Sequence, residues 1–510
     1  MKKLVSALLA LVMVLGLTAF ADLPLTDEGI TLKFAAPVRP EHIDYDKMWM
    51  FKKYEEMTGV HIEWDLVPDA GWTERKNLLL ASEDLPDVFF RGGITVNDLL
   101  TYGVKQDFII DLTNLIEEYA PNISAMLEQY PDVKAAITLD GKIMGLPQVI
   151  IAVGPRTNPF WINEKWLEKC GIEMPTTVDE FVNACIAFTQ CDYNGDGEAN
   201  EYAINLRSSS TSINNMYNVL YGMFGMCNLG ANSGWFDVDE NGEPRFYPTD
   251  ERCKAMYDMT ATLWENNCFD PDFLTQSNAQ LTTKGLENQF AILAGVNNPG
   301  YCSEDLENWT YLPVLENEYG ETKFNAVGSM LNNYGTFCIT KACKNPEIAI
   351  QWADFFYSTA GAELVYWGAE GETFNYDENG ERVYVDEILN GTMGEWLPKS
   401  GSSMPLVQDP AIVYDYSKLT TVKQMEAGEA FAEFAPKSIW YPVLTADESA
   451  SIATVKTDID SYIAEARLKF MMGELDVEND WDAYVAKLEE MGMAQYMEVY
   501  TTAYERSLGK

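Results

Sequence analysis

The sequence predicts an α/β fold with a largely parallel sheet in its first part, and the order of apolar patterns carries that prediction. Apolar residues alternate over 30–36, recur at helical spacing over 48–57, and alternate again over 60–66. A helix around 72–82 and a short apolar strand at 87–90 continue the series. Strands that alternate with helices are typical of a parallel sheet. With 510 residues, the chain is long enough for two or more domains.

The rest of the chain is predicted to be mainly helical, with two hairpins. Thr177 with Glu180 and Thr445 with Glu448 are capping boxes that mark helix starts. An apolar stripe after the second box predicts one long amphipathic helix that ends at Gly473. Turns containing Asn-Gly predict the two hairpins. The remaining expected helices cover 113–119, 123–130, 164–170, 348–357, 480–491 and 493–506, and the hairpin turns lie at 239–242 and 378–380.

The first residues predict a secretory signal peptide, residues 1–21. Met1-Lys2-Lys3 is charged, the run from Leu4 to Phe20 is apolar, and Ala19-Phe20-Ala21 is a cleavage signal. An uncleaved anchor is the alternative, but the run is short for a membrane span. No cysteine precedes residue 170, so the cleavage point offers no cysteine for a lipid anchor. We expect an extracytoplasmic protein, either secreted or associated with the cell surface.

Charge and composition exclude several kinds of partner. The chain carries 79 acidic and 35 basic residues and a formal net charge of -44. Such a charge repels nucleic acid and anionic membranes. Hydrophobic residues make up 47% of the chain, which is ample for cores and argues against disorder. We expect a soluble monomer that binds no nucleic acid.

The inventory of reactive side chains argues against catalysis. Only His42 and His61 are present, and both are expected on the surface, whereas Ser-His-Asp and Cys-His machinery needs a positioned imidazole. The nine cysteines show no repeated C-x-x-C spacing, so they indicate neither a zinc site nor a disulfide scaffold. One cysteine pair could bridge, but the sequence does not select it. A glycosidase would need two carboxylates, and among 79 acids the presence of such a pair carries no information.

An oxygen-rich loop at 192–201 matches part of an EF-hand. Its first, third, fifth, sixth and seventh residues have the types that an EF-hand uses at those places. The twelfth place is Ala203 instead of Glu, so Asn200 and Glu201 would supply further oxygens. The alternative is a solvated turn between a helix and a strand. We predict a structural Ca²⁺ site formed by Asp192, Asn194, Asp196, Glu198, Asn200 and Glu201.

A set of short landmarks, in their order and spacing, resembles a known family. The landmarks span nearly the whole mature chain and lie at 81–88, 140–147, 161–166, 175–177, 192–201, 345–347, 368–371, 470–473 and 481–484. The chain is similar to family-1 extracellular solute-binding proteins of carbohydrate ABC importers. It is most similar to their long branch, which includes lipoprotein LplA-like and alginate-oligosaccharide-binding members.

The resemblance implies a two-lobe periplasmic-binding-protein-like fold of type II, with a hinge between the lobes and a helical C-terminal region. We expect an N-terminal α/β lobe at 22–155 plus about 300–365, and a C-terminal lobe at 156–299 plus about 366–510. The chain would cross the hinge more than once. The family also implies an EF-hand-like calcium loop, closure over an oligosaccharide and delivery to permease subunits of an ABC importer. Many relatives carry a lipobox cysteine, which this chain lacks.

A sugar site needs aromatic platforms for ring faces and polar groups for hydroxyls. Ligands of parallel α/β sheets bind beyond the carboxyl ends of the strands. Trp396 is the strongest candidate because it follows a loop without periodicity, and Glu370, bracketed by two glycines, is second. Core packing is an equal alternative for any single tryptophan. The candidates are Arg39, Trp72, Arg91, Gln148, Trp161, Trp235, Tyr301, Asn332, Tyr334, Trp367, Glu370, Trp396 and Trp440.

Arg39 and Arg91 stand out in a chain this acidic. They would suit an acidic sugar, but each cation can equally hydrogen-bond neutral hydroxyls.

Three functions are compatible with these observations. The first is a binding protein that delivers an oligosaccharide to an importer, and it involves no enzymatic step. The second is an exported carbohydrate enzyme that uses a carboxylate pair, although a glycosidase of this length would more often be a (β/α)₈ barrel. The third is a surface interaction module without a role in uptake, against which stands the single two-lobe pattern. We favour the first, chiefly on the resemblance.

Overall fold

The structure is a computed structural model of the 510-residue chain. It describes residues 23–195, 197–198, 200–227, 229, 234–239, 241–302, 306–319, 323–324, 330–378, 380–398, 404–413, 418–435 and 443–508. The predicted signal peptide, Asp196 and Trp440 therefore lie outside the described residues.

The chain divides into two compact units, and it passes between them at 149–150, 330–331 and 413–414. Unit 1 contains the residues up to Val149 and Leu331–Val413, and unit 2 contains Ile150–Met330 and the residues from Tyr414 onward. Two boundaries differ from the expected ones. Residues 300–330 belong to unit 2 because their strand pairs with a strand of that unit. Residues 366–413 belong to unit 1, where the Pro398 carbonyl accepts a hydrogen bond from Arg91.

Unit 1 is built on a sheet with the strand order β16-β6-β13-β3-β1-β2. The first three strands in sequence are parallel, as predicted, because β1 pairs in parallel with both β2 and β3. The expectation of a largely parallel sheet is incomplete, since β13 runs antiparallel between β3 and β6. Strand β13 belongs to unit 1 but comes much later in the sequence, directly after the chain returns from unit 2. The strands are β1 (Ile30–Val38), β2 (Val60–Pro68), β3 (Val88–Ile94), β6 (Leu146–Ile150), β13 (Leu331–Ile339) and β16 (Val407–Gln408).

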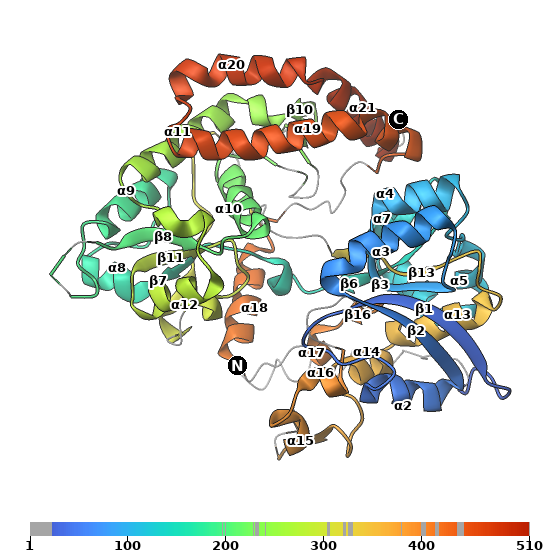
Figure 1. The fold of residues 1–510 in the computed structure, drawn as a ribbon. Helices are drawn as coiled ribbons and strands as arrows, with labels where there is room; N and C mark the ends of the chain where they lie inside the picture. Colours follow the sequence, from blue (N-terminus) through green and yellow to red (C-terminus); the bar gives the residue numbers. More distant parts are fainter. Residues whose placement is uncertain are drawn as a thin grey trace. The chain divides into compact units, whose positions relative to one another are not determined.

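Helices cover both faces of this sheet. Figure 1 shows α2 (Trp49–Thr58) and α13 (Pro346–Asp354) on one face and α3 (Asp69–Ser82) on the other. Because β1 lies between β3 and β2, right-handed crossovers to the two neighbours must place α2 and α3 on opposite faces. On the α2 face, Phe34 packs edge-on against Trp64 and Trp352, with ring centroids 5.4 and 5.0 Å away.

Smaller elements complete unit 1. They include two short antiparallel hairpins, and one of them is the hairpin predicted around residue 379. The elements are α4 (Val96–Asp98), α5 (Thr113–Tyr119), α6 (Pro121–Gln129), α7 (Pro131–Ile137), β4 (Thr138–Leu139), β5 (Lys142–Ile143), α14 (Thr359–Tyr366), β14 (Phe374–Tyr376), β15 (Arg382–Tyr384), α15 (Asp386–Leu389), α16 (Met393–Trp396) and α17 (Pro410–Val413).

Unit 2 contains a second mixed sheet with the order β12-β7-β11-β8. Its strands β8 and β11 are parallel, and β7 is antiparallel to β11 and to β12. The predicted hairpin around 239–242 is confirmed as β9 and β10. These elements are β7 (Trp161–Asn163), α8 (Glu164–Cys170), α9 (Val178–Phe188), β8 (Tyr202–Leu206), α10 (Ser210–Met223), β9 (Phe236–Val238), β10 (Pro244–Phe246), α11 (Glu251–Glu265), α12 (Asn278–Leu286), β11 (Phe290–Ala294) and β12 (Trp309–Tyr311).

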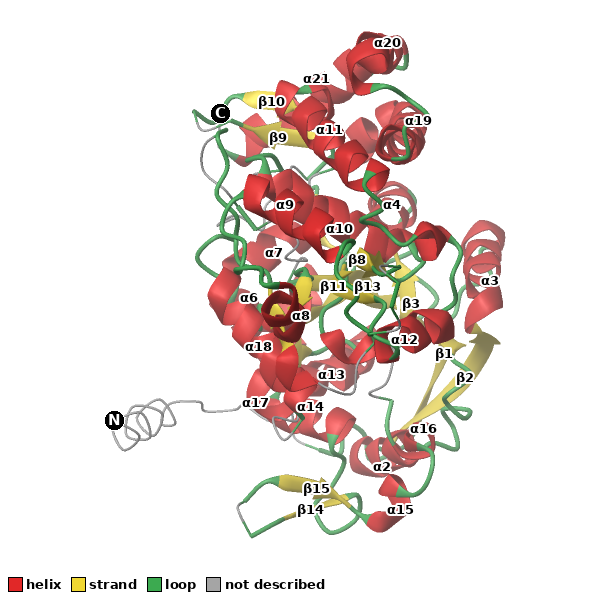
Figure 2. Ribbon diagram, turned by 90° about the vertical axis from the view of Figure 1, so that its left-hand side faces the viewer, coloured by secondary structure: helices red, strands yellow, loops and turns green. Residues whose placement is uncertain are grey.

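The C-terminal region of unit 2 is helical, as predicted. It contains α18 (Leu419–Phe431), α19 (Ala446–Met471), α20 (Val477–Glu490) and α21 (Met493–Ser507). The helix α19 packs on α11, where the rings of Tyr257 and Phe470 stack with centroids 5.2 Å apart. Both predicted capping boxes are present, at the starts of α9 and α19. Figure 2 shows how strongly helices dominate the described chain.

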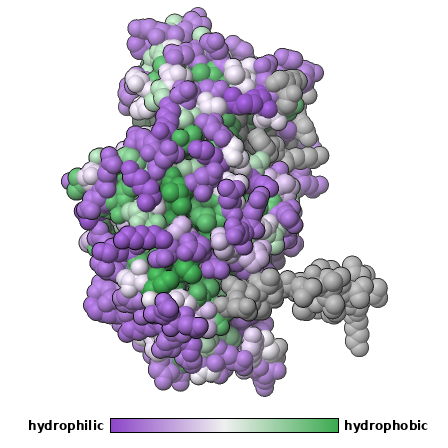
Figure 3. All heavy atoms as spheres, turned by 90° about the vertical axis from the view of Figure 1, so that its right-hand side faces the viewer, coloured by the Kyte–Doolittle hydropathy of each residue, from purple (hydrophilic) through white to green (hydrophobic). Residues whose placement is uncertain are grey.

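One face of the surface is largely hydrophilic. Hydrophilic residues cover most of the face drawn in Figure 3, with hydrophobic residues visible in separate patches. Within the described residues, no helix has both the length and the apolar character that crossing a bilayer requires.

Candidate ligand-binding and calcium sites

The two candidate arginines lie at neighbouring parallel strands of unit 1. Arg39 comes directly after β1, and Arg91 lies within β3, two residues beyond Phe89, the last residue of β3 that pairs with β1. Both therefore lie at the edge of the sheet where the carboxyl ends of parallel strands meet, which is the expected place for a ligand.

Arg91 is almost completely buried, with 5% of its surface exposed. Its guanidinium carbon lies 5.2 Å from the ring centroid of Tyr45, and Nη2 donates to the Pro398 carbonyl at 3.2 Å. Nε and Nη1 have no hydrogen-bond acceptor. Burial lowers the pKa of Arg91, and the nearby positive charge of Arg39 also acts to lower it. A buried guanidinium without a carboxylate partner is an unfavourable arrangement.

The backbone around Arg91 is also unusual. Its φ of 56° lies in the left-handed region, which non-glycine residues rarely adopt. The next residue must be glycine, because a Cβ at Gly92 would lie 2.7 Å from the ring of Trp72. The indole Nε1 of Trp72 donates to the Gly92 carbonyl at 2.5 Å. Trp72 is buried and packs against the backbone that follows Arg91. It is therefore not an exposed face on which a sugar ring could stack, contrary to our expectation.

The segment that contains Trp396 lies close to the same edge. Residues 393–396 form the short helix α16, whereas the sequence predicted a loop. A Cβ at Gly394 would lie 1.9 Å from the Glu41 carbonyl oxygen, so this glycine is required by close backbone packing. The packing holds the helix against the chain that follows Arg39. Trp396 is partly exposed, as a binding platform would need to be.

Other candidates in unit 1 differ in accessibility. The Asn332 amide donates to Oε1 of the buried Gln148 at 2.7 Å, across the neighbouring strands β13 and β6. Tyr334 is partly buried, and Glu370 is exposed in its turn. Trp367 is buried, and its Nε1 donates to the Ile412 carbonyl at 2.5 Å, so it packs in the core. We therefore no longer consider Trp367 a platform.

The candidates in unit 2 do not form one cluster in the described chain. Trp161 has 0% exposure and donates to the Val296 carbonyl at 3.0 Å, so it belongs to the core and our expectation for it was wrong. Trp235 is partly buried, and its indole donates to Asp460 of α19 at 2.7 Å. Tyr301 is 38% exposed and has the Arg207 guanidinium 4.8 Å from its ring centroid.

Sequence reasoning missed two tyrosines near Arg91. Tyr45 is buried beneath the guanidinium and donates its hydroxyl to the Pro37 carbonyl at 2.8 Å. The hydroxyl of Tyr366, whose pKa is raised by burial, accepts a hydrogen bond from Gln408 at 2.8 Å, and this tyrosine lies near enough to Arg91 to interact with it electrostatically. Their chain positions carry no periodicity or motif that marks them, because long-range packing brings them to this arginine.

The oxygen-rich loop folds around two carboxylates. Asp192 accepts backbone hydrogen bonds from Gly195 at 2.7 Å and from Gly197 at 3.0 Å. Glu201, which is only 3% exposed, accepts from the backbone of Asn194 at 2.9 Å and of Asn200 at 3.1 Å. The two glycines adopt left-handed φ values of 80° and 93°, which the tight turn needs.

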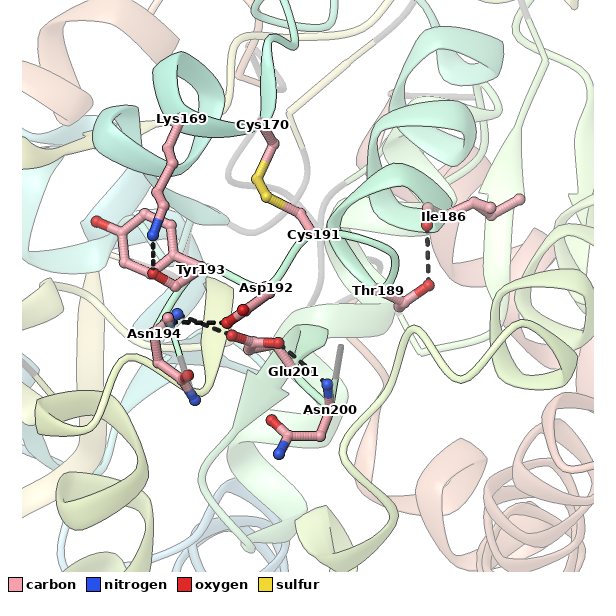
Figure 4. The surroundings of a disulfide bond; sticks show 11 residues. Lys169, Cys170, Ile186, Thr189, Cys191, Asp192, Tyr193, Asn194, Asn200 and Glu201 are labelled. Atoms are coloured by element: carbon pink, nitrogen blue, oxygen red, sulfur yellow. Dashed lines mark hydrogen bonds between the residues drawn. A yellow bond between two sulfur atoms is a disulfide. The ribbon is translucent and has the colours of Figure 1, made fainter. Parts of the chain in front are cut away.

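A disulfide fixes the start of this loop to the end of α8 (Figure 4). Cys170 is bonded to Cys191, directly before Asp192. The Lys169 ammonium donates to the Tyr193 carbonyl, and the Tyr193 ring stacks on Trp166 at 4.2 Å. Tyr193 thus packs on the core of unit 2.

The loop supplies oxygen atoms, the type of ligand that Ca²⁺ prefers. Ca²⁺ takes six to eight oxygen ligands, and the described loop offers the carboxylates of Asp192, Glu198 and Glu201 and the amide oxygens of Asn194 and Asn200. These three carboxylates do not converge on one point in the described part of the loop. Among the described residues, no three acidic, histidine or cysteine side chains lie together as metal ligands would. The fourth predicted carboxylate, Asp196, lies outside that part of the chain.

The two α/β units define a two-domain binding-protein fold, and comparison with known proteins gives its family. The profile of the family "Bacterial extracellular solute-binding protein" matches residues 39–363. The chain belongs to this family.

Two curated relatives align over most of the chain. One is the fructooligosaccharide ABC transporter substrate-binding protein FusA of Streptococcus pneumoniae, 26% identical over 94% of this chain and 91% of the relative. Another is the polygalacturonan/rhamnogalacturonan-binding protein YtcQ of Bacillus subtilis, 23% identical over 89% and 88%. Among solved structures, the S. pneumoniae FusA EF-hand mutant in complex with fructo-nystose has a TM-score of 0.75 and 24% identity, covering 94% of this chain and 99% of that one.

Proposed function

We propose that this protein is the exported substrate-binding component of an ABC importer, that it captures an oligosaccharide, and that it delivers the sugar unchanged to a permease. The observation that carries the proposal is family membership combined with relatives that align over 94% and 89% of the chain. Both of those relatives are named for binding oligosaccharides or polysaccharides.

The sugar contacts we propose in unit 1 are Arg39, Arg91 and Trp396, with Gln148, Asn332, Tyr334 and Glu370 as further candidates. Support comes from the position of the two arginines at the carboxyl edge of the sheet and from the packing of α16 beside Glu41. A partly exposed indole offers a face to a sugar ring, and the guanidinium groups offer donors to its oxygens. Tyr301 is the exposed aromatic candidate of unit 2, and Trp235 and Trp440 are further candidates there.

We propose that capture works by closure of one lobe on the other about a hinge. A sugar that contacts both units would stabilise the closed arrangement by its higher affinity for it. The protein would act as a monomer with its permease and would neither bind nucleic acid nor catalyse a reaction.

We propose that Ca²⁺ is held by Asp192, Asn194, Asp196, Glu198, Asn200 and Glu201. The ion would be structural, tying the chain between α9 and β8 into one conformation. Support comes from the oxygen-rich loop folded around Asp192 and Glu201, and from the FusA relative, of which an EF-hand mutant has been solved.

A thermal-shift screen of the mature chain tests the proposed function. The panel contains neutral and acidic plant, mucin and algal oligosaccharides, and each mixture is analysed afterwards for cleavage. The proposal predicts that at least one sugar raises the melting temperature and is recovered intact. A sugar that is consumed would favour a carbohydrate enzyme, and a panel without any stabilising sugar would contradict oligosaccharide binding.

A further inference from the structure

Arg91 combines two unfavourable features on one residue. Its guanidinium is buried with Nε and Nη1 unpaired, and its backbone has a left-handed φ of 56°. Strained residues persist only when the surrounding structure holds them, and they cluster at binding sites. Here the supporting contact is the indole of Trp72, which holds the Gly92 carbonyl directly after the arginine.

No carboxylate within the described part of the chain bonds directly to this guanidinium, and the one acidic residue whose charge acts on it is Glu41. Among 79 acidic residues, none within the described part of the chain forms a salt bridge with Arg91. Its contacts are a carbonyl oxygen, of Pro398, and the face of the Tyr45 ring. By contrast, the mostly buried Arg245 of unit 2 is paired with Asp237 at 2.7 Å, the usual arrangement for such a residue.

A second cation lies beside the first. Arg39 directly follows β1, and Arg91 lies in the neighbouring strand β3. The exposed Glu41 lies 4.0 Å from Arg39, and its charge acts against that of Arg39 on the pKa of Arg91. Two guanidinium groups with Glu41 as their one neighbouring carboxylate among the described residues leave a net positive spot in a protein whose net charge is -44. An anion placed between them would gain charge-assisted hydrogen bonds from both.

We infer that Arg91 and Arg39 form an anion-binding subsite that takes the carboxylate of a hexuronate residue in the bound oligosaccharide. This inference rests on the proposed function and specifies its substrate class. A carboxylate suits the site because it is small, planar and able to accept from several guanidinium N–H groups. Since Nε and Nη1 are covered by protein, the incoming carboxylate must displace atoms that now cover them.

The same geometry predicts selectivity against neutral sugars. A hydroxyl can accept one of these hydrogen bonds but cannot neutralise a buried cation. A hexuronate and its carboxyl-reduced counterpart differ only at that carbon, so the pair isolates the contribution of the charge. We expect the reduced sugar to bind about 10- to 100-fold more weakly, the range for losing hydrogen bonds to a charged group.

The test is calorimetric titration of the mature chain with oligosaccharides of galacturonate, mannuronate and glucuronate, and with the carboxyl-reduced form of each. Arg91→Met should weaken binding of the preferred uronate about 10- to 100-fold and weaken binding of the reduced form much less. Arg75→Met is the matched control, because Arg75 also lies in unit 1 but pairs with Asp65 at 2.7 Å. It should change neither affinity.

Stability supplies a second readout. Removing an unpaired buried cation should leave the melting temperature of Arg91→Met without sugar unchanged or raise it. A variant that melts at a much lower temperature would mean that Arg91 has a structural role, and would overturn the inference.

The other outcomes separate the inference from the proposed function. If a neutral sugar binds as tightly as its uronate, or if Arg91→Met weakens both alike, the protein is an oligosaccharide-binding protein and the uronate subsite is wrong. If no sugar of either kind binds, both fail. A final titration uses inorganic sulfate alone. If sulfate binds as tightly as the uronate, the site recognises a free anion and the inference of a sugar carboxylate is wrong.

Discussion

At the scale of single residues, burial separates the aromatic candidates into two groups. Trp161 is enclosed in the core of unit 2, whereas Trp396 is partly exposed on a short helix. Sequence ranked Trp396 first but kept Trp161 as a candidate, because a tryptophan in a core and one on a platform can have the same local pattern. Only the packing of distant segments distinguishes them.

This difference predicts opposite effects of the same substitution. Trp396→Ala should weaken the affinity for the preferred oligosaccharide about tenfold by removing a stacking face, with little loss of stability. Trp161→Ala should lower the free energy of unfolding by about 3–5 kcal/mol, the cost of a large cavity in a core. Denaturant unfolding and calorimetry on both variants check this. A large loss of stability for Trp396→Ala would show that it is a core residue.

At the scale of elements, local sequence motifs predicted helix starts and ends correctly, because these depend on neighbouring residues. The capping boxes at Thr177 and Thr445 begin α9 and α19 as predicted. Gly59 and Gly473 end their helices with left-handed φ values of 71° and 73°. Features that depend on contacts between distant segments could not be predicted. The sequence did not place β13 between β3 and β6, and it did not identify which two cysteines form the disulfide.

The junction between α19 and α21 predicts a pH dependence. Arg506 donates to both carboxylate oxygens of Glu448, at 2.8 and 2.7 Å, and these hydrogen bonds lower the pKa of Glu448 below its ordinary value of 4.5. A lowered native pKa stabilises the fold above the ordinary value, and this contribution is lost as pH falls through the native pKa. Glu448→Gln should therefore cost about 1 kcal/mol near neutral pH and nothing in strong acid.

Urea unfolding of the wild type and Glu448→Gln between pH 3 and 7 measures that difference. Glu490→Gln is the control, since Glu490 forms an exposed pair with Lys487 in α20 and should have little effect at any pH. A difference between Glu448→Gln and the wild type that stays constant across this range would contradict the linkage.

The oxygen-rich loop predicts a metal-dependent stability. Chelation should lower the melting temperature, and added Ca²⁺ should restore it, because an ion that binds only the folded state stabilises that state. Asp192→Asn should remove the response by weakening the first ligand. Glu168→Gln on the neighbouring helix α8 is the control and should keep it. Identical melting curves with chelator and with Ca²⁺ would rule out the site.

The disulfide beside this loop makes a separate contribution. The bond closes a loop with a sequence separation of 21 residues, for which chain entropy predicts about 3 kcal/mol. The double variant Cys170→Ser/Cys191→Ser should lose about that much in denaturant unfolding. It should also bind Ca²⁺ more weakly, because Asp192 follows the bridged cysteine directly. Cys343→Ser, at a half-buried unpaired cysteine, should change neither quantity.

At the scale of the whole molecule, sequence predicted the architecture better than the division of the chain. Landmarks spread over nearly the whole chain predicted the binding-protein fold because their order is set by that fold. The boundaries were wrong at 300–330 and 366–413 because a chain that passes between units three times carries no linker composition at the crossings. The arrangement around Arg91 was equally beyond sequence reasoning, since β1, β3 and residue 398 meet only after folding.

The central claim is that the protein binds an oligosaccharide and returns it unchanged. Its most direct test is an equilibrium titration of the mature chain with the sugar that stabilises it most, followed by mass spectrometry of the sugar recovered from the same cell. The account predicts saturable binding of one sugar per chain and a recovered sugar of unaltered mass. Shortened sugar, or no saturable binding by any oligosaccharide, would contradict it.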